Sequence, residues 1–250
     1  MHPTGNRLTL FLRAVCLSIG ILPLCAMAQS VPADAMLERV VAQLPTKPIQ
    51  ASGTMLVRLR RGLPRQTYAF TLDANWQQPN PTVTYTIKEK NGSPIKSLTF
   101  RPHHEQPFTY RSTAELQEAP LPDLTANIAQ TDISWMDLTL SFLWWRGADY
   151  VGEDTVRGFH CYVIEVPAPE TISYPGYAKV RLWISSEQGL LLQAQGFNDT
   201  GTPIRRFWVQ SVRQIDETWM IQTLEVQQTN LDQRTRLQID DVKINAGNDL

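Results

Sequence analysis

The stretch YAKVRLWISSEQGLLLQAQGF, residues 177–197, decides the fold class. Val180, Leu182 and Ile184 stand at every second position, which is the period-two pattern of a strand with one buried face. A turn signal at 187–189 follows, and the apolar run after it reads as a return strand. Two strands joined by so short a turn must pair antiparallel. The stretch therefore predicts an antiparallel sheet.

The same pattern recurs along most of the chain. Short turns, among them Asn91-Gly92, separate the alternating runs, and Asn-Gly is a strong hairpin signal. We therefore expect a mainly β (α+β) protein with about 10–11 strands in a meander and a few helices. The predicted strands are 55–60, 67–76, 82–87, 95–100, 156–166, 177–185, 190–197, 204–212, 220–227 and 234–244.

Two segments break the strand pattern with helical signals. Residues 32–44 have apolar side chains at i, i+1, i+4, i+5 and i+8 from Met36, which predicts an amphipathic helix. Residues 138–145 follow a capping-box pattern from Ser134 to Asp137 and are apolar on nearly every side. A helix of that kind must be covered all round or must touch something apolar.

Residues 102–131 show neither the strand period of two nor the helical period of 3.6. We therefore predict a long surface loop there, with a short helical piece near 114–118. Within it, the run His103-His104-Glu105 is interpreted as an exposed polar loop, not as a metal site. Cys161 is interpreted as a buried strand thiol. The sequence has no Gly-rich phosphate loop, nucleophile elbow or zinc-spaced Cys/His set. We predict no catalytic residue, no metal and no cofactor, and hence no enzyme.

The first 28 residues have the form of an export signal. A basic start, an apolar stretch at 14–24 and a small-x-small site predict cleavage after Ala28 and a periplasmic protein. The alternative is a lipid anchor on Cys25, but Leu24 stands where lipoprotein processing requires a small residue. Residues 29–250 are then one domain. With 23 Lys+Arg against 24 Asp+Glu, the near-neutral charge argues against a nucleic-acid partner.

The order of these segments resembles that of the bacterial lipoprotein carriers of the LolA/LolB type, and more closely their outer-membrane lipoprotein-sorting relatives. The most specific part is the strand 179–184, its hairpin, the turn 197–201 and the Arg205-bearing strand that follows. Residues 131–138 resemble the family's segment that enters a lid, and 235–242 resemble its closing strand.

The resemblance implies an incomplete antiparallel β-barrel whose concave side is closed by helices around an apolar cavity. It also implies a periplasmic carrier of lipoprotein acyl chains or other lipids, with an inner-membrane exporter or an outer-membrane acceptor protein as partners. We expect the cavity between the concave face and the segment 135–145, and a lid with few polar ties. The residues predicted to line cavity and lid are Trp135, Leu138, Phe142, Trp144, Trp145, Tyr85, Trp183 and Phe207.

The sequence departs from the family at one position. In the well-studied carriers an Arg before a Pro-Asn pair ties the lid to the barrel, and here Gln78 precedes Pro79-Asn80. A neutral amide can donate hydrogen bonds but lacks the charged fork of an Arg. Gln78 is the predicted latch position, and the latch is expected to differ. Two other functions remain open, a sensor or interaction module that binds an envelope membrane partner, and an envelope hydrolase.

Overall fold

The computed structural model describes residues 32–59, 62–77, 79–112, 115–172, 174–215 and 218–244. The predicted export signal, its cleavage site after Ala28, Cys25 and the latch position Gln78 lie outside these residues. Those expectations stay predictions.

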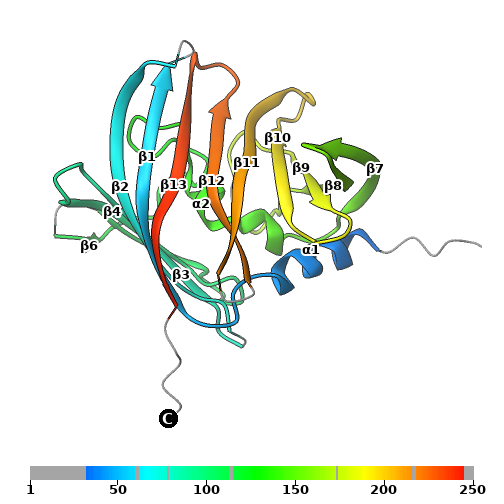
Figure 1. Cartoon of the computed structure of the whole chain (residues 1–250), viewed down its shortest axis with the longest axis horizontal. Helices are drawn as coiled ribbons and strands as arrows, with labels where there is room; N and C mark the ends of the chain where they lie inside the picture. Colours follow the sequence, from blue (N-terminus) through cyan, green and yellow to red (C-terminus); the bar gives the residue numbers. More distant parts are fainter. Residues whose placement is uncertain are drawn as a thin grey trace, which may run out of the picture. The chain divides into compact units, whose positions relative to one another are not determined.

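One antiparallel sheet dominates the structure (Figure 1). Among the described residues it has 13 strands in the order β6-β5-β4-β3-β2-β1-β13-β12-β11-β10-β9-β8-β7. The strands are β1 (Ile49–Leu59), β2 (Pro64–Asn75), β3 (Thr82–Lys88), β4 (Pro94–Phe100), β5 (Phe108–Ser112), β6 (Gln117–Glu118), β7 (Asp149–Val156), β8 (Phe159–Pro167), β9 (Lys179–Ser185), β10 (Leu191–Phe197), β11 (Pro203–Ile215), β12 (Thr218–Gln228) and β13 (Gln233–Ile244).

The strand order explains why a lid exists at all. Two meanders, β1 to β6 and β7 to β13, are joined where β1 pairs with β13, with Met55 opposite Leu237. The two edge strands, β6 and β7, are consecutive in the chain but lie at opposite edges of the sheet. The connection between them, residues 119–148, must therefore cross the sheet. We call the face that it crosses the covered face.

Three helical elements of the described chain lie on the covered face, and two of them, which form the lid, belong to this connection. Helix α1 (Ala33–Ala42) buries Met36, Leu37 and Val40 and contacts the lid segment. Arg39 donates to the Ser186 carbonyl at the β9–β10 turn, 3.3 Å away. The lid itself is not the single helix predicted for 138–145. It consists of α2 (Trp135–Thr139) and the 3-10 helix η1 (Ser141–Trp144), which are separated at Leu140.

The break at Leu140 has a backbone cause. Its φ is 49°, in the left-handed region that is unfavourable for residues with a Cβ, so the α-helical hydrogen-bond ladder ends there. The break could not be predicted from residue types, because the usual residue at such a position is Gly and here it is Leu. The capping box predicted at Ser134 and Asp137 is confirmed, with both reciprocal hydrogen bonds present.

The prediction of 10–11 strands is too low. Residues 102–131 contain two short strands, β5 and β6, where a loop was predicted, and the predicted helical piece near 114–118 is wrong because 117–118 pair with β5. The predicted strand 156–166 belongs to a hairpin, and β7 precedes its turn at Arg157-Gly158. Both turn residues have positive φ, and Arg is an unusual residue there. The sheet is open, with β6 and β7 at its two edges, which agrees with the predicted incomplete barrel in that the sheet does not close on itself.

The main core lies between the covered face, α1 and the lid. Strand side chains reach it at alternate positions, such as Tyr68, Phe70 and Leu72 on β2. Gly53 is required in this layer, because a Cβ there would lie 2.0 Å from the Gln238 carbonyl oxygen and 2.8 Å from the Phe70 ring. A smaller cluster on the opposite, outer face contains Cys161, which is fully buried, as predicted.

Candidate functional site

An apolar pocket of about 140 Å³ opens between α1, the lid and the covered face. We call it the apolar pocket. The side chains around it are almost all hydrocarbon or aromatic, which suits a ligand without charge. They are Val40, Gln43, Leu44, Pro45, Ile49, Leu72, Trp76, Tyr85, Leu140, Leu143, Leu190, Leu191, Val212, Trp219, Met220, Ile221 and Ile239, together with the backbone at Gly189.

Tyr85 shows how the pocket interrupts the core. It shares its strand face with Val83 and Ile87, which are both fully buried, yet it is only half-buried itself because it lines the pocket. Its ring lies 6.2 Å from that of Phe70. The apolar surroundings raise the pKa of the Tyr85 hydroxyl well above its ordinary value, so this group stays neutral.

Most of the predicted lid residues are core residues. Trp135, Leu138, Phe142 and Trp145 are buried in the main cluster, and Phe207 of β11 is buried beneath the lid. The apolar pocket reaches the lid only at Leu140 and Leu143. The cavity expected beneath residues 135–145 is therefore largely filled by the lid's own side chains.

Trp144 and Trp183 differ from that group. Trp144 is half-buried and stacks on Trp76 of the apolar pocket, with ring centroids 5.6 Å apart and planes 13° apart. Trp183 packs in the smaller cluster on the outer face and donates to the Asp154 carboxylate at 2.9 Å. The structure thus separates Trp183 from the other predicted lining residues, and we do not include it in the site.

A buried ion pair fixes the start of the lid. Arg205 of β11 reaches the Asp137 carboxylate with Nη1 at 2.6 Å, and both side chains are about 5% exposed or less. The same carboxylate accepts from the Ser134 backbone N–H at 2.8 Å and from its hydroxyl at 2.7 Å. Arg205 also donates to the Thr125 carbonyl and to Asn127 Oδ1. Burial alone would lower the pKa of the Arg205 guanidinium, but Asp137 more than offsets this and raises it.

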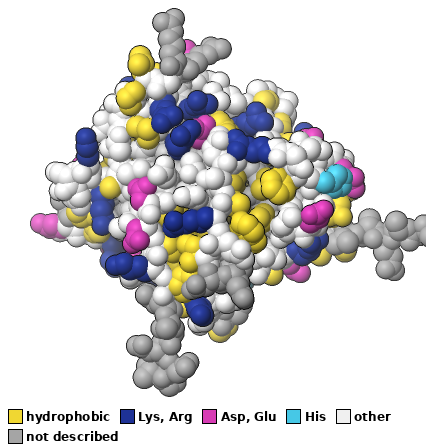
Figure 2. All heavy atoms as spheres, in the orientation of Figure 1, with side chains coloured by type: hydrophobic (Ala, Val, Ile, Leu, Met, Phe, Trp, Pro, Cys, Tyr) yellow, Lys and Arg dark blue, Asp and Glu magenta, His cyan; other side chains and the backbone are white. Residues whose placement is uncertain are grey.

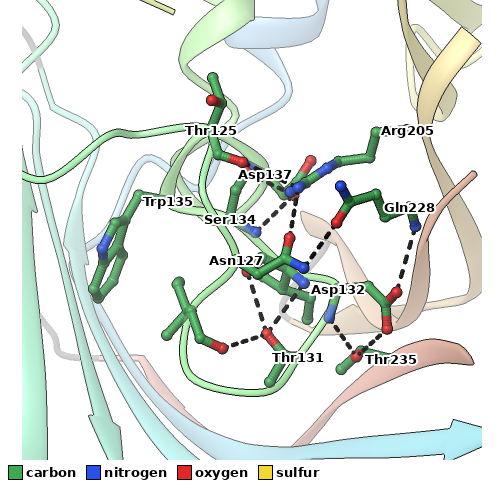
Figure 3. A network of polar contacts seen from close by, with 12 residues as sticks. Thr125, Asn127, Thr131, Asp132, Ser134, Trp135, Asp137, Arg205, Gln228 and Thr235 are labelled. Atoms are coloured by element: carbon green, nitrogen blue, oxygen red, sulfur yellow. Dashed lines mark hydrogen bonds and ion pairs between the residues drawn. The ribbon is translucent and has the colours of Figure 1, made fainter. Parts of the chain in front are cut away.

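A second set of bonds ties the same segment to the closing strands (Figure 3). The Asp132 carboxylate accepts from the Thr235 hydroxyl at 2.8 Å, and Thr235 accepts in turn from the Asp132 N–H. Asn127 donates to Gln228 Oε1 at 2.8 Å. Residues 125–137 are thus tied to β11, β12 and β13, and we call them the lid anchor. The lid with few polar ties that we expected is wrong for this half.

Asp132 gives the lid anchor a predicted pH dependence. Burial raises the pKa of its carboxyl above the ordinary value of 3.8, against the opposing hydrogen bonds from Thr235 and Gln228. The folded state therefore holds this proton more tightly than the unfolded state, so the contribution of Asp132 to stability falls as pH rises past about 4. We expect the stability of Asp132→Asn relative to the wild type to increase from pH 3 upward and then to level off.

Urea unfolding at several pH values between 3 and 7 measures this difference. Asp199→Asn, on an exposed turn, controls for the general effect of removing one negative charge. The expectation is contradicted if the free energy of unfolding of Asp132→Asn minus that of the wild type becomes smaller, or more negative, as pH rises.

The Arg205–Asp137 pair was not predicted as a site, although both residues stand in the two stretches that resemble the family. The signal that could have found it is an Arg alternating with Phe207 and Val209 on the core face of a strand. A cation at such a position needs a buried partner. Gln78, the predicted latch, lies outside the described residues.

The described residues contain neither a metal-binding cluster nor a membrane-spanning helix. No group of three or more His, Cys, Asp or Glu there could hold a metal ion, and His103 and His104 are exposed. No helix in the described part of the chain is long and apolar enough to cross a membrane.

On the face in Figure 2, hydrophobic side chains gather in the central and lower part, with Lys and Arg around them. Trp219, at the apolar pocket, is 41% exposed.

Comparisons with known proteins agree with the fold. A family model described as "Uncharacterized protein" matches residues 114–249, more than half of the chain. A putative outer membrane lipoprotein-sorting protein domain from Vibrio parahaemolyticus superposes with a TM-score of 0.72 at 11% identity, over 86% of this chain and 93% of that one. The chain belongs to the LolA-like family. No curated protein matches its sequence.

Two further solved structures share this LolA-like fold. A DUF1329 family protein from Desulfovibrio piger has a TM-score of 0.71 at 15% identity, over 87% of this chain and 95% of that one. A LolA superfamily protein from Nitrosomonas europaea has a TM-score of 0.66 at 12% identity, over 86% and 94%. At these identities the likeness concerns the fold alone, and function must follow from the residues of the LolA-like chain itself.

Proposed function

We propose that this LolA-like protein binds the acyl chains of lipoproteins or other lipids and carries them through the periplasm toward the outer membrane. The observation that carries the proposal is the apolar pocket, which adjoins a partly exposed Trp219 and leaves Tyr85 only half-buried in the core layer. An acyl chain gains about 0.8 kcal/mol for each methylene it buries. A lined apolar pocket can therefore replace a membrane during transit.

The size of the pocket requires movement. At about 140 Å³ it is smaller than the roughly 300–1,000 Å³ of ordinary ligand pockets. The lid anchor holds α2 by an ion pair, whereas η1 after Leu140 is held mainly by apolar packing and by one hydrogen bond from Tyr174 to Ser141. We infer that the half of the lid after Leu140 moves away while α2 stays fixed, and that the pocket enlarges into the space beneath η1.

Native mass spectrometry of the protein purified from its own periplasm tests the proposal. We expect a mass increase that matches one or more acyl chains and disappears on delipidation. A bare protein mass, with no uptake of added palmitoyl lipid, would overturn the proposal. A stable complex with an envelope membrane protein that lipid does not affect would favour the interaction module instead.

A further inference from the structure

A second pocket, of about 420 Å³, lies on the other side of the lid. We call it the polar pocket, because charged and hydroxyl groups share its wall with aromatic rings. Its lining residues are Phe100, Pro102, His104, Glu105, Pro107, Ser141, Trp144, Trp145, Arg146, Pro169, Thr171, Ile172 and Tyr174.

The lid forms the wall between the two pockets. Leu140 and Leu143 line the apolar pocket, whereas Ser141, Trp144 and Trp145 line the polar one. The two kinds of residue alternate along η1, so opposite sides of one short helix face the two spaces.

The stacked tryptophans stand at the boundary. Trp76 lines only the apolar pocket and Trp144 only the polar pocket, and their rings are in parallel contact with centroids 5.6 Å apart. Phe100 of the polar pocket packs edge-on against Trp144 at 5.4 Å. Moving the Trp144 ring would join the two spaces without disturbing the lid anchor, which involves neither residue.

The polar pocket also contains a donor without a well-formed hydrogen bond. Trp145 is 5% exposed, and its indole Nε1 has no partner of good hydrogen-bond geometry among the described residues. The Tyr174 ring packs against Trp145 at 4.8 Å, and the Tyr174 hydroxyl, which donates to Ser141 Oγ, gives the indole N–H only a weak contact. A buried N–H so poorly paired is costly, and an oxygen from a ligand would complete its hydrogen bond.

Charge indicates the kind of head group. Arg146 is the fixed cation of the lining and is exposed, with only a 3.4 Å contact to the Trp145 carbonyl. The lining also contains a carboxylate, Glu105, which lies beside His104 in the sequence on the loop between β4 and β5. An anionic oxygen near Arg146 and the Trp145 N–H would make charge-assisted hydrogen bonds.

We propose that the two pockets are the two ends of one site for a single-chain lipid with an acidic head group. The acyl chain occupies the apolar pocket, the carboxylate or phosphate lies beside Arg146 and Trp145, and the Trp76–Trp144 stack opens to admit the chain. This inference rests on the proposed acyl-chain function and adds the head group and the gate.

Displacement of the apolar fluorescent probe 1-N-phenylnaphthylamine from the full chain tests the inference. Palmitate, palmitoyl lysophosphatidylglycerol and neutral monopalmitoylglycerol serve as competitors with the same chain. We expect Arg146→Gln to weaken the two acidic competitors roughly tenfold and the neutral one less than twofold. Arg111→Gln, an exposed arginine on β5 outside both pockets, should change none of them. An Arg146→Gln effect that is equal for all three, or absent, overturns the inference.

The remaining outcomes separate the two proposals. If no palmitoyl compound displaces the probe from the wild type, the acyl-chain function itself fails. If only palmitate loses affinity in Arg146→Gln, the head group is a carboxylate, and if only the lysophospholipid does, it is a phosphate. For the gate, Trp144→Ala should speed palmitate release several-fold, and an unchanged release rate in a variant that melts cooperatively overturns that part.

Discussion

Replacing Arg205 by Met is expected to lower the free energy of unfolding by about 3–5 kcal/mol, because it leaves a carboxylate buried without its cation. Asp137 is only 4% exposed in its side chain, and the guanidinium at 2.6 Å is the one charge of opposite sign that it contacts among the described residues. Methionine fills a similar volume, so the loss measures the ion pair and its hydrogen bonds more than a cavity.

Two comparisons keep this expectation specific. Arg206 is the next residue on β11 and is exposed, where it donates to Gln193 and lies over Trp208. Arg206→Met should therefore cost about 1 kcal/mol or less. The double variant Arg205→Met with Asp137→Leu should regain only part of the loss, because an apolar pair needs no desolvation but leaves the buried Ser134 N–H and hydroxyl without their acceptor. Urea unfolding of the four proteins decides the matter, and equal losses for the two single variants would refute the role of the pair.

The strands were predictable because each depends on its own sequence. Alternation at 82–87 and 177–185 predicted β3 and β9 to within two residues at each end, since a half-buried strand needs apolar side chains at every second position. The strand order was not accessible in this way. The pairing of β1 with β13 joins residues far apart in the chain, and it is this pairing that forces the 119–148 connection across the sheet.

The site was harder to predict than the fold. The late strands β9, β10 and β11 have aromatic residues on the outer face as well as apolar residues on the covered face, but cations cover part of the outer ones. Arg206 lies over Trp208, and Lys179 and Arg181 lie over Phe197, with ring distances between 5.1 and 5.9 Å. Periodicity shows which face a side chain takes but not whether the space there is filled. The eight predicted lining residues therefore include several that simply pack.

The break at Leu140 and the lid anchor share one reason for escaping prediction. Each depends on contacts from other parts of the chain, which hold a leucine in the left-handed region or bring an arginine to a helix N-terminus. Local propensity opposes the first and does not address the second. Such positions are frequent at functional sites, where the surrounding structure overrides local preference.

Placing a charge in the apolar pocket is expected to abolish ligand binding while the fold survives. Ile221 of β12 is half-buried and lines this pocket, so Ile221→Asp puts a carboxylate where an acyl chain would lie. Bringing a chain against that group requires the carboxylate to lose water without gaining a partner. We expect affinity for 1-N-phenylnaphthylamine to fall about 100-fold, equivalent to roughly 2.7 kcal/mol. Because the side chain also reaches solvent, the loss of stability should be smaller, about 1–2 kcal/mol.

The controls for this variant separate pocket occupation from general damage. Leu121→Asp makes the same chemical change at a residue that is 48% exposed and does not line the pocket, and it should bind the probe as the wild type does. Ile221→Val keeps the lining apolar and should retain affinity within a few-fold. Wild-type binding by Ile221→Asp would mean that the ligand lies elsewhere. The pocket between α1, β12 and the lid would then not be the ligand-binding site. Loss of binding in Ile221→Asp alone would place the apolar ligand at this wall of the sheet, because the two aspartates differ only in which surface they charge.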